Sequence, residues 1–216
     1  MRIALFQYFQ IICLIVAVLY FKRLGKWQIR VFLPLLIFTN LAEMAGVNAR
    51  ILGWYPNYFI YNIYLVGSAT FMIYLFYRML SMNQRMKQIF IIIGVLLLTF
   101  LLLNISFLEG FHQFNSFSLV LIELLNIILS CIVLFQLVFH QDNSKSLFKE
   151  PYFWINTGTL FFSLGTIVLF GLQKYIINNH LQIENKSLYH ALAPILNIIL
   201  YSAWSYGFLQ CRKTSS

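Results

Sequence analysis

Residues 88–108 read QIFIIIGVLLLTFLLLNISFL, an apolar run without a charged side chain. A helix needs about 20 mostly apolar residues to cross the roughly 30 Å hydrocarbon core of a bilayer. Its backbone groups are then satisfied by hydrogen bonds inside the segment, which is what lets it lie in lipid. The run therefore predicts a transmembrane helix, and it sets the pattern for the rest of the chain.

Similar apolar segments on both sides of this run, joined by short connections, account for nearly the whole sequence. Hydrophobic residues make up 61% of the 216 residues and charged residues 10%, which excludes a soluble globular protein. We predict an all-α fold, a polytopic membrane bundle that forms one domain over residues 1–216 without a soluble domain. Its seven transmembrane helices are expected at 4–21, 31–53, 57–79, 88–108, 117–139, 151–173 and 188–210.

Lysine and arginine residues are distributed unequally between alternate connections, and such residues favour the cytoplasmic side of a membrane. One set of connections carries Lys22, Arg23, Lys26, Arg30, Arg78, Arg85, Lys87, Lys145, Lys149, Arg212 and Lys213. The other set carries only Arg2, Arg50, Lys174 and Lys186. This bias predicts an N-terminus outside and a C-terminus in the cytoplasm. The net charge of +9 is thus a topology signal and does not indicate nucleic-acid binding.

Two carboxylates lie inside apolar segments, where ionisable groups are costly and usually face the interior of a bundle. At helical spacing, Asn40, Glu43, Val47 and Arg50 share one face of the second segment. In the fifth segment Glu123 forms a comparable stripe, which is made by Ser116, Glu123, Asn126 and Ser130. Both stripes are expected to point inward.

The expected topology and a rise of about 1.5 Å per residue give the depth of each polar residue. Glu43 falls near the midplane and Glu123 in the outer half. Asn62, Asn104, His190 and Asn197 also fall between the midplane and the outer surface. This layer has the composition of a pocket open to the exterior. The alternative is that these groups are interhelical hydrogen-bonding residues. For Gly158 and Gly165 in the sixth segment, close helix packing is the expected role.

The sequence contains no recognisable catalytic or metal-binding motif. Its four histidines show no HExxH or paired ligand spacing, and neither a GxSxG elbow nor a P-loop is present. We therefore expect no catalytic residue, no metal and no cofactor. The three cysteines, in or beside apolar segments without a CxxC pair, are expected to serve in packing.

Several short motifs give the chain a family resemblance. They are Glu43 to Gly46, Tyr61-Asn62-Ile63-Tyr64, Phe114-Asn115-Ser116, and Pro151-Tyr152-Phe153-Trp154-Ile155 followed by Gly158 and Leu160-Phe161-Phe162. Together they resemble a family of small bacterial seven-helix integral membrane proteins without an assigned activity, whose architecture is similar to the seven-helix sensor regions of bacterial histidine kinases. The resemblance implies a multi-pass protein of the bacterial inner (cytoplasmic) membrane. The chain departs from the sensors in ending at Ser216 without a kinase.

Three functions are compatible with these observations. The first is a receptor-like or accessory signalling module, which binds a small ligand in the outer polar layer and acts through a separate cytoplasmic or membrane partner. The second is a small transporter or channel that uses Glu43 and Glu123, and the third is a structural subunit of a membrane complex. An enzyme ranks below all three. The protein is expected to lie in a lipid bilayer. The sequence does not identify the ligand, the partner or the oligomeric state.

Overall fold

The structure is a computed structural model that describes residues 4–26, 28–111, 113–139, 146–171, 182–183 and 186–211. It is almost entirely helical, which confirms the all-α class. The α-helices are α1 (Leu5–Leu19), α2 (Phe21–Lys26), α3 (Phe32–Val47), α4 (Tyr58–Met79), α5 (Gln84–Leu103), α6 (Ser116–Phe139), α7 (Pro151–Gly171) and α9 (Leu188–Gln210). A π-helical turn (Asn104–Leu108) extends α5, and a 3-10 turn (Leu147–Lys149) precedes α7. The two-residue strands β1 (Gln182–Ile183) and β2 (Lys186–Ser187) pair antiparallel.

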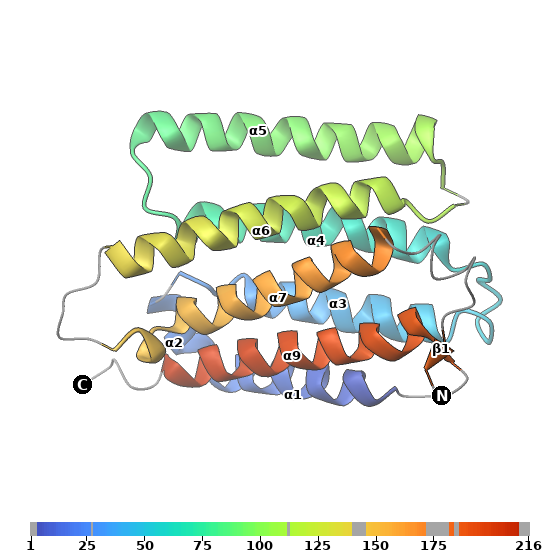
Figure 1. Cartoon of the computed structure of the whole chain (residues 1–216), viewed down its shortest axis with the longest axis horizontal. Helices are drawn as coiled ribbons and strands as arrows, with labels where there is room; N and C mark the ends of the chain where they lie inside the picture. Colours follow the sequence, from blue (N-terminus) through green and yellow to red (C-terminus); the bar gives the residue numbers. More distant parts are fainter. Residues whose placement is uncertain are drawn as a thin grey trace.

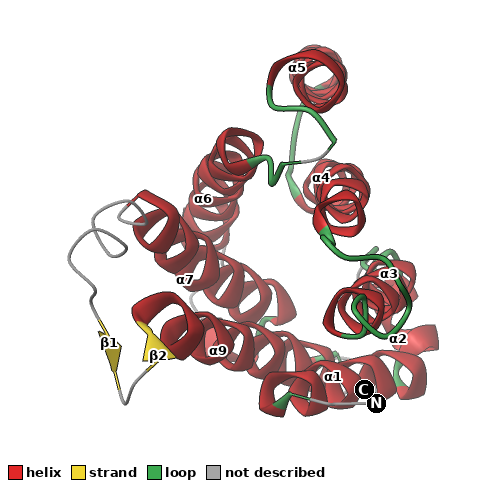
Figure 2. Cartoon of the chain, turned by 90° about the vertical axis from the view of Figure 1, so that its right-hand side faces the viewer, coloured by secondary structure: helices red, strands yellow, loops and turns green. Residues whose placement is uncertain are grey.

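Six of the long helices form a ring whose axes run along the same direction (Figures 1 and 2). Each helix packs on two neighbours in the order α1, α3, α4, α6, α7, α9 and back to α1. The helix α5 lies outside this ring and packs on α4. The end of the bundle at the left of Figure 1, where α3, α5 and α7 begin, is called the basic end, since Lys22, Arg23, Arg30, Arg78, Arg85, Lys87 and Lys149 lie at helix termini there.

Five helices are long and apolar enough to cross a membrane, which indicates a multi-pass membrane protein. They are Tyr58–Met79, Gln84–Leu108, Ser116–Phe139, Pro151–Gly171 and Ala191–Gln210. The helices α1 and α3 are apolar but shorter, with 15 and 16 residues. Each of the seven segments predicted to be helical contains a helix.

The prediction that the second segment stays helical to residue 53 is wrong. The helix α3 ends at Val47, and residues 48–53 form turns that include Gly53 at a φ of 73°. Asn57 closes this end by donating its side-chain amide to the carbonyl of Gly46 at 3.0 Å. Arg50 consequently leaves the face of Glu43. It is exposed, and its guanidinium lies 5.1 Å from the ring centre of Tyr55.

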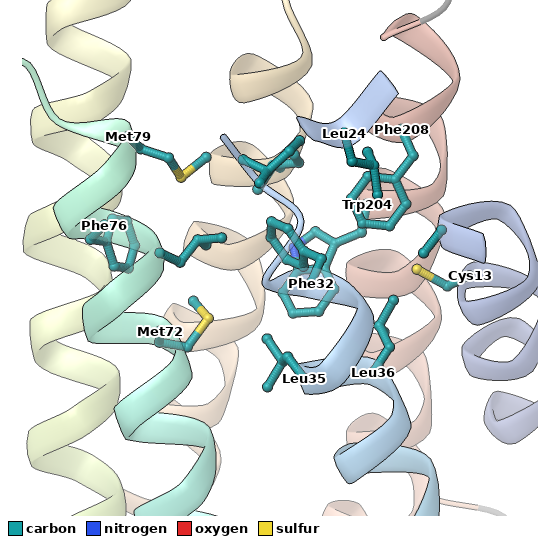
Figure 3. Packing of buried hydrophobic residues seen from close by; sticks show 14 of the residues in the cluster. Cys13, Leu24, Phe32, Leu35, Leu36, Met72, Phe76, Met79, Trp204 and Phe208 are labelled. Carbon is teal, nitrogen blue, oxygen red and sulfur yellow. The ribbon is translucent and has the colours of Figure 1, made fainter. Parts of the chain in front are cut away.

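Large apolar side chains fill the half of the ring next to the basic end (Figure 3). Phe32 lies at the centre, with its ring 4.8 Å from that of Trp204 and 5.2 Å from that of Phe208, both edge-on. This apolar plug comprises Phe32, Leu35, Leu36, Met72, Leu75, Phe76, Met79, Leu129, Val133, Trp204 and Phe208, all buried. It closes the interior of the ring at this end.

Small residues bring α7 and α9 together, as the sequence predicted for Gly158 and Gly165. A Cβ atom added at Gly158 would lie 2.6 Å from the Cβ of Ala203. One added at Gly207 would lie 2.9 Å from Cγ1 of Ile155 and 3.1 Å from the carbonyl of Pro151. Since no side chain intervenes, the two backbones approach closely, which is the usual source of helix association in lipid.

Replacing Gly158 by leucine should separate α7 from α9. We expect Gly158→Leu to lower the free energy of unfolding in detergent by at least about 1–3 kcal/mol, because overpacking forces both helices apart. Gly171→Leu is the matched control, since nothing lies within 4 Å of a Cβ at that position. Thermal unfolding of the two purified variants gives the comparison. Equal midpoints would contradict the close contact.

Candidate functional site

Glu123 lies buried in the ring, on the face of α6 that meets α7. Its Oε2 atom accepts hydrogen bonds from the hydroxyl of Ser163 on α7 at 2.5 Å and from the amide of Asn126 at 3.2 Å. Asn126 stands three residues further along α6, so helical spacing places it beside Glu123. Of the predicted inward stripe, Glu123, Asn126 and Ser130 are buried, whereas Ser116, the first residue of α6, is only half-buried.

Tyr64 of α4 lies near both glutamates. Its side chain is hydrogen-bonded with Thr39 of α3 and lies within electrostatic range of both Glu43 and Glu123. Tyr201 of α9 lies within the same range of Tyr64 and Glu43. Five helices of the ring thus contribute to a central polar cluster, defined as Thr39, Glu43, Tyr64, Glu123, Asn126, Ser163 and Tyr201.

The carboxyl groups of this cluster have no lysine or arginine beside them among the described residues. Every lysine and arginine within the described ranges lies at an end of the bundle, whereas Glu43 and Glu123 lie between the ends. No group of three or more His, Cys, Asp or Glu side chains suited to a metal ion occurs in the described part of the chain. Among the described residues, hydrogen bonds and not ion pairs therefore satisfy the carboxyl group of Glu123.

Burial along α9 changes at the level of the cluster. From Ala191 to Ile199 no residue of α9 is fully buried, whereas seven residues from Leu200 to Cys211 are buried. Glu43 and Tyr64 are likewise only half-buried, although they face other ring helices. Side chains of α9 are therefore less buried beyond the cluster than at the basic end, whereas α4, α6 and α7 keep buried residues there, such as Ile60, Ile122 and Leu169. We call the far part, from the cluster to the end opposite the basic end, the open half, because α9 is less buried there.

Two of the predicted site residues, Asn62 and Asn104, hold the loop between α5 and α6. Asn62 donates to the carbonyl of Gln113 at 3.0 Å and accepts from the backbone of Asn115 at 3.4 Å. The amide of Asn104 lies 2.7 Å from Oε2 of Glu109 and 2.6 Å from the hydroxyl of Ser118. The side chains of Asn62 and Asn104 are thus hydrogen-bonded to residues of this loop and of helix ends. This is the arrangement expected if they are hydrogen-bonding residues of the bundle and not residues of a pocket.

The remaining predicted residues lie in different surroundings. Asn40 and Asn197 donate to carbonyls four residues earlier in their own helices, those of Leu36 and Ala193. Asn197 stands four residues before Tyr201 and so faces the open half on the same side of α9. Arg50, as described above, points away from the cluster. His190 belongs to α9, but its side chain lies outside the described residues.

Sequence reasoning missed Thr39, Tyr64 and Tyr201 as members of the cluster. The signal was weak, because tyrosine is common in transmembrane segments and usually marks an interface. A tyrosine far from both ends of an apolar segment, as at Tyr64, does indicate a polar partner inside the bundle. Comparison of the chain with family models, with curated proteins and with solved structures returned no match.

The contact between Glu123 and Ser163 can be measured by a double-mutant cycle. We expect Glu123→Ala and Ser163→Ala to show a coupling energy of about 0.5–2 kcal/mol in detergent unfolding, because each removes the partner of the other. Glu123→Ala combined with Ser130→Ala provides the control pair, since no hydrogen bond joins those side chains. Additive effects of Glu123→Ala and Ser163→Ala would contradict the bond.

Proposed function

We propose that the chain is a seven-helix integral membrane protein, N-out and C-in, with a receptor-like role. A small ligand enters the open half from outside, binds at the central polar cluster, and shifts helices at the basic end, which act on a separate cytoplasmic or membrane partner. The observation that carries this proposal is the central polar cluster, which five helices of the ring form next to the apolar plug. The resemblance to seven-helix sensor regions points the same way.

The packing of α1 and α3 supports seven spans rather than five. Cys13 of α1 is hydrogen-bonded with Ser205 of α9, and α1 packs along α9. In the same way α3 packs along α4, where Gly46 lies against Tyr61 and Gly67 against Phe38. A helix of 15 or 16 residues measures about 22–24 Å, so thinning of the bilayer or flanking residues must cover the remainder.

The loops at the basic end support the orientation. Among the described residues, the basic end carries Lys22, Arg23, Arg30, Arg78, Arg85, Lys87 and Lys149, while the opposite end carries Arg50 and Lys186. Under the positive-inside rule the basic end faces the cytoplasm. The open half then faces the exterior, where a ligand can reach it.

The apolar plug favours a receptor over a channel. Phe32, Phe76, Trp204 and Phe208 are buried in the half of the ring that an ion would have to cross after leaving the cluster. An ion without its hydration shell finds no carbonyl or charged ring there to replace that shell. The same plug offers a route for signalling, because its aromatic rings are in contact with one another.

Tyr201 and Trp204 connect the cluster to this route. Their ring centres are 5.9 Å apart, and the indole of Trp204 donates to the hydroxyl of Thr159 on α7 at 3.1 Å. Trp204 also packs on Phe32, the first residue of α3 after the basic turn. A ligand that moves Tyr201 would therefore move Trp204, and with it the start of α3 beside Arg30.

Cysteine labelling in intact cells tests the orientation and the open half together. In a background without native cysteines, we expect Ile51→Cys and Asn197→Cys to react with a membrane-impermeant maleimide from outside. Arg85→Cys should react only after permeabilisation, and Val133→Cys, in the plug, should stay unreactive in the folded protein. Labelling of Arg85→Cys from outside would reverse the topology, and an inert Asn197→Cys would contradict an accessible open half.

Reconstitution separates a receptor from a transporter. We expect liposomes containing the purified protein to stay tight to Na⁺, K⁺ and protons under an imposed gradient, because the plug blocks the basic end. Crosslinking in native membranes should capture a partner through the turn between α2 and α3. Ion flux that disappears in Glu43→Gln would refute the receptor assignment in favour of transport.

A further inference from the structure

We infer that the connection between α1 and α3 binds the phosphate headgroup of an anionic phospholipid at the basic end of the bundle. Residues 21–30 carry four cations, Lys22, Arg23, Lys26 and Arg30, and no carboxylate. The negative surface of an anionic bilayer complements this charge. The inference goes beyond the proposed function and holds for either orientation, because the basic end meets a membrane surface in both.

The backbone of this connection is fixed before any ligand binds. Leu24 and Ile29 are fully buried in the same core as Phe32. Gln28, at a φ of 58°, donates its backbone N–H to the carbonyl of Gly25 at 3.2 Å. Ile29 donates in the same way to Leu24 at 3.1 Å, and such paired bonds close the end of a helix. A ligand of the cations therefore does not have to order the chain that carries them.

Aromatic rings hold two of the arginine side chains in place. The guanidinium of Arg30 lies 5.3 Å from the ring centre of Phe21, and that of Arg23 lies 5.6 Å from the ring centre of Tyr20. A Cβ atom added at Gly25 would collide with the guanidinium of Arg30, so the glycine gives this group its room. A guanidinium stacked on a ring keeps its N–H edge for a phosphate, which it binds with two parallel hydrogen bonds.

Apolar side chains next to the cations favour a phospholipid over an acidic protein. Val18 and Leu19, at the end of α1, are more than half exposed on the lipid-facing surface of the bundle. Phe21 and Lys22 follow them and are also exposed. Acyl chains can therefore lie along the end of α1 while the phosphate meets the cations. An acidic protein segment would complement the cations alone.

Thermal unfolding of the purified chain in neutral detergent, with phospholipid added to the micelles, tests the inference. We expect dioleoyl phosphatidylglycerol to raise the midpoint by about 3–5 °C at about ten times its dissociation constant. Dioleoyl phosphatidylcholine, whose headgroup has no net charge, should give no comparable rise. Sodium glycerol 3-phosphate, which carries the phosphate without acyl chains, should give none either.

Variants of the basic end locate the effect. Arg23→Gln combined with Arg30→Gln should weaken the binding of phosphatidylglycerol at least about tenfold, because each guanidinium donates charge-assisted hydrogen bonds to phosphate. Arg85→Gln combined with Lys87→Gln is the matched control, since it removes the same charge from the same end, at the start of α5, and should keep the binding. Where the first double variant does not fold, Arg30→Lys decides. It keeps the charge and removes the flat group that stacks on Phe21, so part of the binding should be lost.

Each other result overturns the inference. An equal loss in the two double variants would assign the effect to the net charge of the basic end, and full binding by Arg30→Lys would do the same. An equal rise with phosphatidylcholine would assign it to any phospholipid, and an equal rise with glycerol 3-phosphate to a free phosphate. Lack of any rise with phosphatidylglycerol would leave the connection to a protein partner. None of these results bears on the open half, which the cysteine labelling tests, so the proposed function can fail separately.

Discussion

The close approach of α7 and α9 is the contact on which the rest of the structure depends. At Gly158 and Gly207 the two backbones meet without an intervening side chain, and this contact joins α6 and α7 to α9 and α1 in one ring. In lipid the hydrophobic effect does not drive helices together, so such packing must hold them. The ring in turn gives Glu123 a partner, because the hydroxyl of Ser163 reaches its carboxylate only while α7 stays seated between α6 and α9. The hydrogen bond between Ser163 and Glu123 in the polar cluster therefore depends on the glycines that let α7 pack closely on α9.

The interior of the ring combines two requirements that oppose each other. Large aromatic side chains such as Phe32 and Trp204 satisfy the need for dense packing next to the basic end, where the indole of Trp204 donates to the hydroxyl of Thr159. Carboxylates need the reverse, namely hydrogen-bond donors, or a cation, and room for them. The chain separates the two along its axis, so that burial on α9 begins at Leu200 and increases towards Cys211. The side chains of α9 are consequently less buried in the open half than next to the basic end.

The sequence predicted the helices well because each segment carries its own signal in length and hydropathy. It also identified Glu43 and Glu123, since a carboxylate in an apolar run stands out. It failed where the outcome depends on the contact between segments. Asn62 and Asn104 look like pocket residues at their depth, yet they bind a loop whose course was unknown. Arg50 was placed on the face of Glu43 because nothing in residues 48–53 except Gly53 indicates that α3 stops at Val47. Tyr64 and Tyr201 acquire their role only once α4 and α9 face the same space.

The arrangement of the ring also explains why α5 can be so apolar. It packs mainly on α4 and meets α6 through Phe100, whose ring lies 6.1 Å from that of Phe117, so most of its surface faces lipid. Residues such as Ile92 and Leu96 are more than half exposed. The helix whose sequence gives the clearest transmembrane signal is thus the one with the smallest share in the interior. Three ring helices, α4, α7 and α9, carry a weaker signal, with mean hydropathies of 1.6, 1.5 and 1.4 against 2.8 for α5 with its π-helical turn. The helix α6 contributes Glu123 and still reaches 2.5, because one carboxylate in a long apolar helix lowers the mean little. Hydropathy thus separates α5 from most of the ring, but the single carboxylate has to be read residue by residue.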